Sequence, residues 1–113
     1  MSESAIQEVI RQQVGENPII LYMKGTPEQP MCGFSQRAAQ ALAACGREFA
    51  YVDVLQDDEV REGVKAFGDW PTIPQLYIDG ELTGGSDIIM EMFDTGELQR
   101  LIDGAGGGEG TSG

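Results

Sequence analysis

The strongest constraint on the fold is a run of five consecutive apolar residues, 19–23, close to the N-terminus. An uninterrupted apolar run of this length is typical of a central strand that is buried on both faces of its sheet. We expect this strand over residues 18–24, because a loop rich in glycine and proline follows it. A chain of 113 residues suffices for about one domain. Because this strand is buried on both faces, other elements of the same domain must cover both sides of the sheet.

Other apolar patterns and turn signals predict the remaining elements. Helices are expected over 2–15, 32–45, 57–67, 86–93 and 97–102, and strands over 49–54, 75–78 and 81–83. Asp79-Gly80 is a hairpin-turn signal between the last two strands, and the first two strands enclose a helix, which predicts a parallel pair. The predicted fold class is therefore α/β, a four-stranded mixed sheet flanked by helices on both faces. Residues 1–103 would form this domain, and 104–113 a disordered glycine-rich tail.

Charge and residue types exclude several classes of function. Seven Lys and Arg against nineteen Asp and Glu give a formal net charge of −12, which repels phosphate backbones and argues against nucleic-acid binding. The sequence has no histidine, so chemistry that needs an imidazole is excluded. Two cysteines are too few for a disulfide scaffold, and the sequence shows neither secretory-signal features nor a membrane-length apolar run. We therefore expect free thiols, a cytoplasmic location and no membrane binding.

Cys32 is the main candidate for chemistry. It follows a proline-rich loop and begins a predicted helix, where free N–H groups and the helix dipole lower the pKa of a thiol; Lys24, across the loop, adds positive charge. The alternative is a buried structural cysteine, which is the interpretation that the alanine-rich surroundings favour for Cys45. Both cysteines lie on one predicted helix, about 20 Å apart, whereas a disulfide needs Cα atoms about 4.4–6.8 Å apart. Cys32 must therefore react with an external thiol or act as a metal ligand.

Three further segments have both a functional and an ordinary interpretation. Pro74 is either a cis proline that leaves the main chain of Ile73 free to pair with an extended peptide, or a trans proline that opens an edge strand. The helix start at 84–87 is either a site for a carboxylate and an ammonium group, with Ser86 or Asp87 as the cap, or a plain helix cap. Arg61 is either a clamp for a carboxylate or a solvated ion pair in an acidic run.

Together these motifs resemble the monothiol glutaredoxins of the Cys-Gly-Phe-Ser type, and most closely their single-domain bacterial members. The resemblance covers residues 5–102, and four motifs carry it in the family's order and spacing: Lys24-Gly25-Thr26-Pro27, Met31-Cys32-Gly33-Phe34-Ser35, Trp70-Pro71-Thr72-Ile73-Pro74-Gln75 and Gly84-Gly85-Ser86-Asp87. It implies a thioredoxin-like fold in which Pro74 is cis.

The resemblance also implies a glutathione-binding site and a role for Cys32 as both reactive thiol and iron ligand. Lys24 and Arg61 would hold the glycyl carboxylate. The main chain of Ile73 would pair with the cysteinyl part, and Ser86 and Asp87 would hold the γ-glutamyl end. The full set of implied glutathione-binding residues is Lys24, Phe34, Arg61, Thr72, Ile73, Pro74, Gly85, Ser86 and Asp87. Several relatives carry cysteine in place of Ser86, so the redox role of that second cysteine is absent here.

The implied function is the carriage of iron–sulfur clusters. A [2Fe–2S] cluster held only by thiolates needs four of them, and Cys32 supplies one per chain, so two chains and two glutathione molecules complete the set. The resemblance implies a cluster-bridged homodimer that passes its cluster to acceptor apoproteins, often with a BolA-like partner. The competing hypothesis is a glutathione-dependent oxidoreductase acting on glutathionylated substrates, at most a weak one because the family's loop at 25–31 displaces glutathione from attack geometry. A third is a peptide-binding module in which Cys32 is inert.

Overall fold

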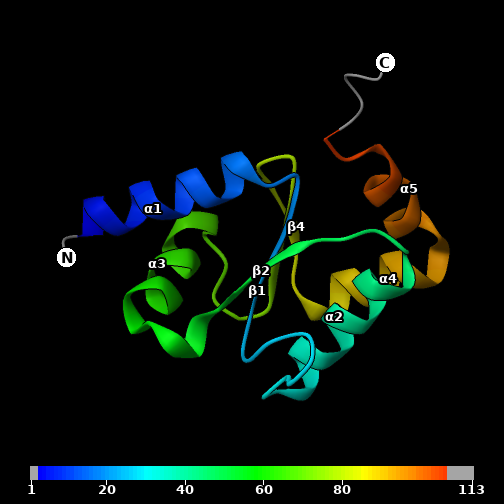
Figure 1. Cartoon of the computed structure of the whole chain (residues 1–113), viewed down its shortest axis with the longest axis horizontal. Coiled ribbons are helices and arrows are strands. Elements are labelled where there is room, and N and C mark those ends of the chain that lie inside the picture. The colour runs from blue at the N-terminus through cyan, green and yellow to red at the C-terminus, as the bar shows by residue number, and fades with distance from the viewer. Residues whose placement is uncertain (1–2, 107–113) are drawn as a thin grey trace.

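The computed structural model describes residues 3–106, and Figure 1 shows a twisted sheet between two groups of helices. The strands are β1 (Ile19–Met23), β2 (Ala50–Asp53), β3 (Gln75–Ile78) and β4 (Glu81–Gly84). The helices are α1 (Glu3–Glu16), α2 (Gly33–Ala44), α3 (Asp58–Gly68), α4 (Ser86–Thr95) and α5 (Glu97–Gly104), with a 3-10 turn, η1, at Val54–Gln56. None of the helices within residues 3–106 has the length and apolar character that a bilayer span requires.

The sheet has the order β2-β1-β3-β4 and is mixed, as predicted. β1 pairs in parallel with β2 and antiparallel with β3, and β3 forms an antiparallel hairpin with β4. The hairpin turn at Asp79 and Gly80 uses positive φ angles of 53° and 83°, a geometry that the Asp-Gly pair favours. The predicted α/β architecture is therefore confirmed, and it follows the thioredoxin-like pattern.

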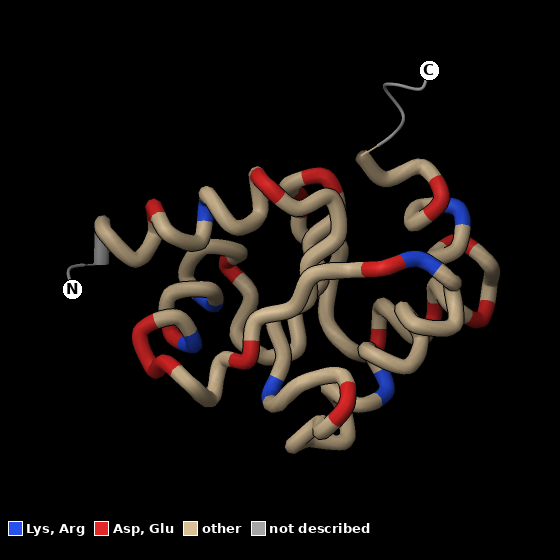
Figure 2. The backbone as a smooth tube through the Cα atoms, in the orientation of Figure 1, with Lys and Arg blue, Asp and Glu red and all other residues tan. Residues whose placement is uncertain are grey.

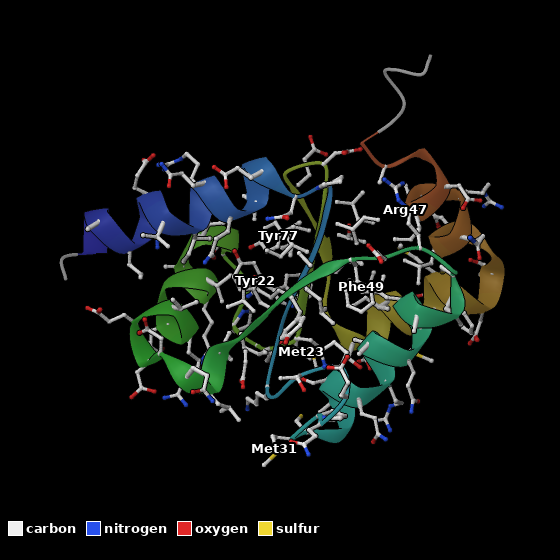
Figure 3. The ribbon with its side chains drawn as sticks, viewed as in Figure 1. Tyr22, Met23, Met31, Arg47, Phe49 and Tyr77 are labelled. Carbon is white, nitrogen blue, oxygen red and sulfur yellow. The ribbon has the colours of Figure 1, made fainter. Side chains whose placement is uncertain are left out.

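β1 is buried along its whole length and contributes to two separate cores. Ile19, Leu21 and Met23 pack in the core on the side of α2, α4 and α5. Ile20 and Tyr22 alternate to the other face and pack in the core under α1 and α3. Figure 3 shows Met23 near α2 and Tyr22 on the side of α1 and α3. The continuous apolar run thus has the cause that we predicted, burial on both faces of the sheet.

Buried polar side chains connect the sheet to the loop that precedes β3. The Tyr77 hydroxyl donates a hydrogen bond to Gln75 Oε1 (2.8 Å), and burial raises the pKa of Tyr77 to about 12. Gln75, itself fully buried, donates through Nε2 to the carbonyls of Trp70 (3.0 Å) and Thr72 (3.2 Å). These bonds satisfy a polar side chain in the core and fix the loop at 70–74, which bears several of the predicted site residues.

The C-terminal boundary that we predicted is wrong by three residues. Gly104 ends α5, and Ala105 is buried instead of belonging to a tail. Arg47 Nη1 donates to the carbonyls of Ile102 and Ala105 (both 2.7 Å), and the amide of Gly106 donates to Asp79 (2.8 Å). These partners come from distant parts of the chain, which explains why glycine content alone misplaced the boundary. The rest of the predicted tail, 107–113, lies outside the described residues.

Candidate functional site

Every predicted site residue lies along one cleft of about 590 Å³. The cleft is formed by the segment after β1, the start of α2, one face of α3, the loop before β3 and the start of α4. The lining residues are Lys24, Cys32, Phe34, Arg61, Glu62, Lys65, Trp70, Pro71, Thr72, Ile73, Pro74, Gly85, Ser86, Asp87 and Ile88. Segments far apart in the sequence therefore meet where the motifs predicted a single ligand site.

Cys32 occupies the position directly before the first turn of α2. Its backbone is extended (φ −155°, ψ 136°), and the Cys32 carbonyl accepts the amide of Gln36 at 2.9 Å. The side chain is partly exposed. The backbone amide of Ser35, in the first turn of α2, is the main influence that lowers the pKa of the Cys32 thiol. Partial burial opposes this effect, while the Phe34 amide and the positive charge of Lys24 add to it. The helix start thus favours a thiolate at Cys32.

Cys45 has the opposite environment, at the other end of α2. It is buried, and burial together with the charge of Asp103 raises the pKa of its thiol. Both cysteines are free, and a helix of 12 residues separates them. Cys45 is therefore buried, as the structural interpretation predicted, whereas Cys32 is not buried.

Two acceptors hold the segment that leads from β1 into the cleft. The buried Ser35 hydroxyl accepts a hydrogen bond from the Lys24 amide (3.0 Å). Asp53 Oδ1, at the end of β2, accepts from the amides of Gly25 (2.9 Å) and Leu55 (3.0 Å). Asp53 thus connects the loop after β1 to the chain that enters α3. β1 ends next to Lys24, which lines the cleft, and Asp53 at the end of β2 fixes the adjacent Gly25.

Glycine is required at the start of the loop over 25–31. Gly25 has a φ of +91°, and a Cβ atom there would lie 2.5 Å from the carbonyl oxygen of Gln29. The loop folds back so that the Met31 amide donates to the Lys24 carbonyl at 2.9 Å. Met31, two-thirds exposed, lies at the outer end of the loop in Figure 3, next to Cys32 in sequence. The closed loop therefore holds Lys24 and Cys32 on the same side of the domain.

The loop at 70–74 contains a cis peptide bond between Ile73 and Pro74. The expectation of a cis proline is confirmed, and the alternative of a trans proline at an edge strand is wrong. The start of α4 differs from one expectation: Gly85 occupies the N-cap, and no side chain caps this helix among the described residues. Ser86 and Asp87 instead form its first turn. A capping role therefore does not explain these two side chains in the cleft.

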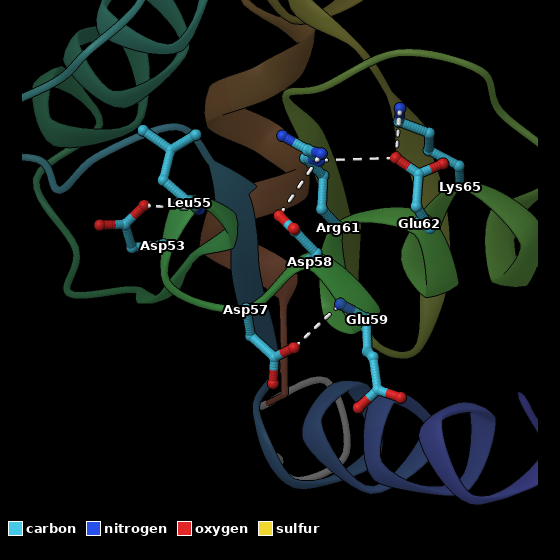
Figure 4. Close-up of polar contacts among 8 residues, drawn as sticks. All are labelled: Asp53, Leu55, Asp57, Asp58, Glu59, Arg61, Glu62 and Lys65. Carbon is cyan, nitrogen blue, oxygen red and sulfur yellow. Dashed lines mark hydrogen bonds and ion pairs between the residues drawn. The ribbon is translucent and has the colours of Figure 1, made fainter. Parts of the chain in front are cut away.

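The α3 face of the cleft carries two cations, Arg61 and Lys65, with Glu62 beside them (Figure 4). Arg61 Nη2 lies 3.4 Å from Asp58 Oδ1, so the helix-face ion pair exists. Arg61 also lines the cleft, so its ion pair with Asp58 is compatible with the predicted role as a carboxylate clamp. Lys65 was not predicted as a site residue, although it follows Arg61 by four residues, the spacing that places two side chains on one helix face.

Basic residues are concentrated in the cleft. The chain has seven Lys and Arg residues, and Lys24, Arg61 and Lys65 line this site. Figure 2 shows how sparse the basic positions are among the acidic ones along the backbone. In a protein with a net charge of −12, such a local excess favours an anionic ligand.

Comparisons with known proteins identify the family of this chain. The glutaredoxin family model matches residues 19–83. Glutaredoxin 4 of Escherichia coli strain K12 is 59% identical over 95 residues, covering 84% of this chain and 83% of that protein. Glutaredoxin 4 of Buchnera aphidicola (subsp. Acyrthosiphon pisum) is 52% identical over 98 residues, covering 87% and 91%. The solution structure of reduced poplar apo GrxS14 is 39% identical and superposes with a TM-score of 0.79 over 91% of this chain and 95% of that one. The chain belongs to the glutaredoxin family.

Proposed function

We propose that this protein is a monothiol glutaredoxin that carries a [2Fe–2S] cluster between two copies of the chain and passes it to acceptor proteins. One observation carries the proposal: a single partly exposed thiol with a lowered pKa lies at a cation-lined cleft, while the other cysteine is buried at the far end of α2. A chain with this arrangement has no nearby partner thiol for an internal disulfide among its described residues. Its thiolate is suited to bind a ligand or a metal from outside.

Glutaredoxins bind glutathione, and the cleft has groups that suit this tripeptide. Lys24 and Arg61 would pair with the glycyl carboxylate, and Lys65 joins them from the same side. The main chain of Ile73, beside the cis proline, would pair with the cysteinyl unit as a strand does. Ser86 and Asp87, in the first turn of α4, would take the γ-glutamyl carboxylate and ammonium groups. Phe34, Thr72, Pro74 and Gly85 would complete the walls.

The ligand count supports a shared cluster as the cargo. Among residues 3–106, no group of three or more His, Cys, Asp or Glu side chains is arranged to hold a metal. One chain would therefore provide one thiolate, Cys32, and an all-thiolate [2Fe–2S] cluster needs four. Two chains and two bound glutathione thiolates supply that number. Because glutathione exchanges with solution, such a cluster is suited to transfer. BolA-like proteins and iron–sulfur apoproteins are the proposed partners, in a reducing, cytoplasmic setting.

Anaerobic reconstitution with iron, sulfide and glutathione tests this proposal. Wild type, Cys32→Ser and Cys45→Ser are compared with and without glutathione, by visible absorption and by size-exclusion mass. We expect a coloured dimer that requires glutathione and is lost in Cys32→Ser, whereas the matched Cys45→Ser variant retains it. A wild-type protein that stays colourless and monomeric, or a cluster that survives in Cys32→Ser, contradicts the proposal.

The lowered pKa of Cys32 also favours a second candidate, a glutathione-dependent oxidoreductase. The Cys32 thiolate would attack a glutathionylated protein, releasing that protein's thiolate and forming a Cys32–glutathione disulfide. A second glutathione thiolate would then attack this disulfide, giving oxidised glutathione and regenerating Cys32. Turnover of a glutathionylated peptide by colourless wild type, lost in Cys32→Ser, would assign this activity. If Cys32→Ser behaves like wild type in both experiments, the thiol is inert, and the chain is instead a peptide-binding module.

A further inference from the structure

A carboxylate of the protein already lies between two cations of the cleft. Glu62 Oε2 accepts a hydrogen bond from Lys65 Nζ at 3.3 Å, and the same oxygen lies 3.5 Å from Arg61 Nε (Figure 4). All three residues line the cleft. Glu62 thus has the place and the charge that the carboxylate of an entering ligand would need in order to pair with both cations.

Glu62 is loosely held in this position. Its side chain is 64% exposed, whereas those of Arg61 and Lys65 are 35% and 31% exposed. At 3.5 Å its contact with Arg61 is an ion pair without a hydrogen bond, and Arg61 Nε is buried with no hydrogen-bond partner in the described part of the chain. A buried N–H group without a partner is an unmet demand for an acceptor. Glu62 can therefore swing into solvent and leave both cations to a better-placed carboxylate.

We propose that Glu62 is an affinity-determining residue, an internal competitor for the carboxylate that Arg61 and Lys65 bind. This inference rests on the proposed function, in which that carboxylate is the glycyl end of glutathione. Before the ligand pairs with the cations it must displace Glu62, which weakens binding and lets bound glutathione exchange. The opposite role is that Glu62 holds Arg61 and Lys65 in their binding positions, which would make it an aid to affinity.

The sign of one substitution separates these two roles. Calorimetric titration with reduced glutathione compares wild type, Glu62→Gln and Glu48→Gln. Glu48 is also exposed but does not line the cleft, so its substitution makes the same change in net charge away from the site. An exposed ion pair is weak, so we expect Glu62→Gln to bind glutathione roughly two- to fivefold more tightly than wild type. Glu48→Gln should stay within about 1.5-fold of wild type, because its charge is screened.

A modified ligand then identifies which carboxylate competes. Glutathione esterified with ethanol at its glycyl carboxylate lacks the negative charge for which Glu62 substitutes, so the gain from Glu62→Gln should disappear with this ester. Unchanged or weaker binding of glutathione by Glu62→Gln overturns the inference, as does an equal gain with the ester. Those results leave the proposed function intact provided that wild type binds glutathione. If the wild-type protein binds no glutathione, the inference about Glu62 and the proposed function are both wrong.

Discussion

At the scale of single residues, Cys32 and Cys45 show how position on one helix sets thiol chemistry. Amides at the start of α2 stabilise a thiolate at Cys32, and burial at the end of the helix disfavours one at Cys45. The thiolate is the reactive form of cysteine. The net charge of the chain does not distinguish the two residues, because it is the same for both. The nearby backbone amides and the burial of each thiol do.

Alkylation rates should therefore separate the two thiols. At pH 7 we expect iodoacetamide to modify Cys32 at least about tenfold faster than Cys45, because Cys32 has both the larger thiolate fraction and the better access. Peptide mass analysis over a pH series measures both rates in one sample. The rate at Cys32 should reach half of its maximum below the ordinary pKa of a thiol. Equal rates at the two positions would contradict the assignment of Cys32 as the reactive thiol.

Asp53 provides a second test at this scale, through the pH dependence of stability. Burial opposes ionisation of Asp53, but hydrogen bonds from Gly25, Leu55 and Gln56 outweigh it, so the pKa of Asp53 is lowered from 3.8. A lowered pKa means that the carboxylate stabilises the fold above its unfolded pKa and loses that effect as pH falls through the folded value. We expect Asp53→Ala to lose about 1–2 kcal/mol of unfolding free energy at pH 7.

Urea denaturation at several pH values measures this effect. The difference between wild type and Asp53→Ala should be constant near neutral pH and shrink as pH falls below about 4. Asp94→Ala, at an exposed position of α4, is the control and should show little difference at any pH. A difference for Asp53→Ala that does not change with pH would mean that its carboxylate charge does not hold the loop.

At the scale of elements, the sequence predicted each long helix and strand within a few residues of its observed limits. Local sequence patterns alone predicted β1, β3 and the Asp79-Gly80 turn, and the structure has all three at the predicted positions. The missed parts depend on distant contacts or on very short segments. The turn η1 has three residues, and the end of α5 is held by Arg47 and Asp79. The order of the strands also was not predicted, because no local pattern says on which side of β1 the hairpin lies.

The candidate site was predictable where it consists of short motifs. Each of the four motifs contributes at least one residue to the lining of the cleft. Glu62 and Lys65 were missed because the acidic run over 57–62 favoured a solvated helix face. Only the packing of α3 beside the loop at 70–74 shows that this face borders the cleft.

The loop over 25–31 can be tested as an element. We expect Gly25→Ala to lose about 1–3 kcal/mol of unfolding free energy, because its φ of +91° is strained for alanine and its Cβ would meet Gln29. Glutathione affinity should fall as well, since Lys24 would shift. Gly15→Ala is the matched control: nothing lies within 4 Å of a Cβ there, and helix propensity favours a small gain in stability. Denaturation curves and calorimetry measure both effects; wild-type behaviour of Gly25→Ala would contradict the role assigned to this loop.

At the scale of the whole molecule, two cores on either side of β1 leave one end of the sheet as the site. The parallel pair β1 and β2 ends there, and α2, α3 and α4 contribute residues around it. Lys24, Arg61 and Lys65 lie in the cleft at this end, although the net charge of the chain is −12. The fold therefore presents one partly exposed thiol beside a cleft that three cations line, in a chain that is acidic overall. We expect the assembly to depend on the cargo, because one chain alone supplies too few thiolates.

The composition of the reconstituted complex tests the central claim most directly. Anaerobic native mass spectrometry after reconstitution counts the chains, glutathione molecules, iron and sulfide in one particle. The account predicts two chains, two glutathione molecules and one [2Fe–2S] cluster, with dissociation to single chains when the cluster is removed. A cluster bound to one chain, or a dimer that holds its cluster without glutathione, would contradict it.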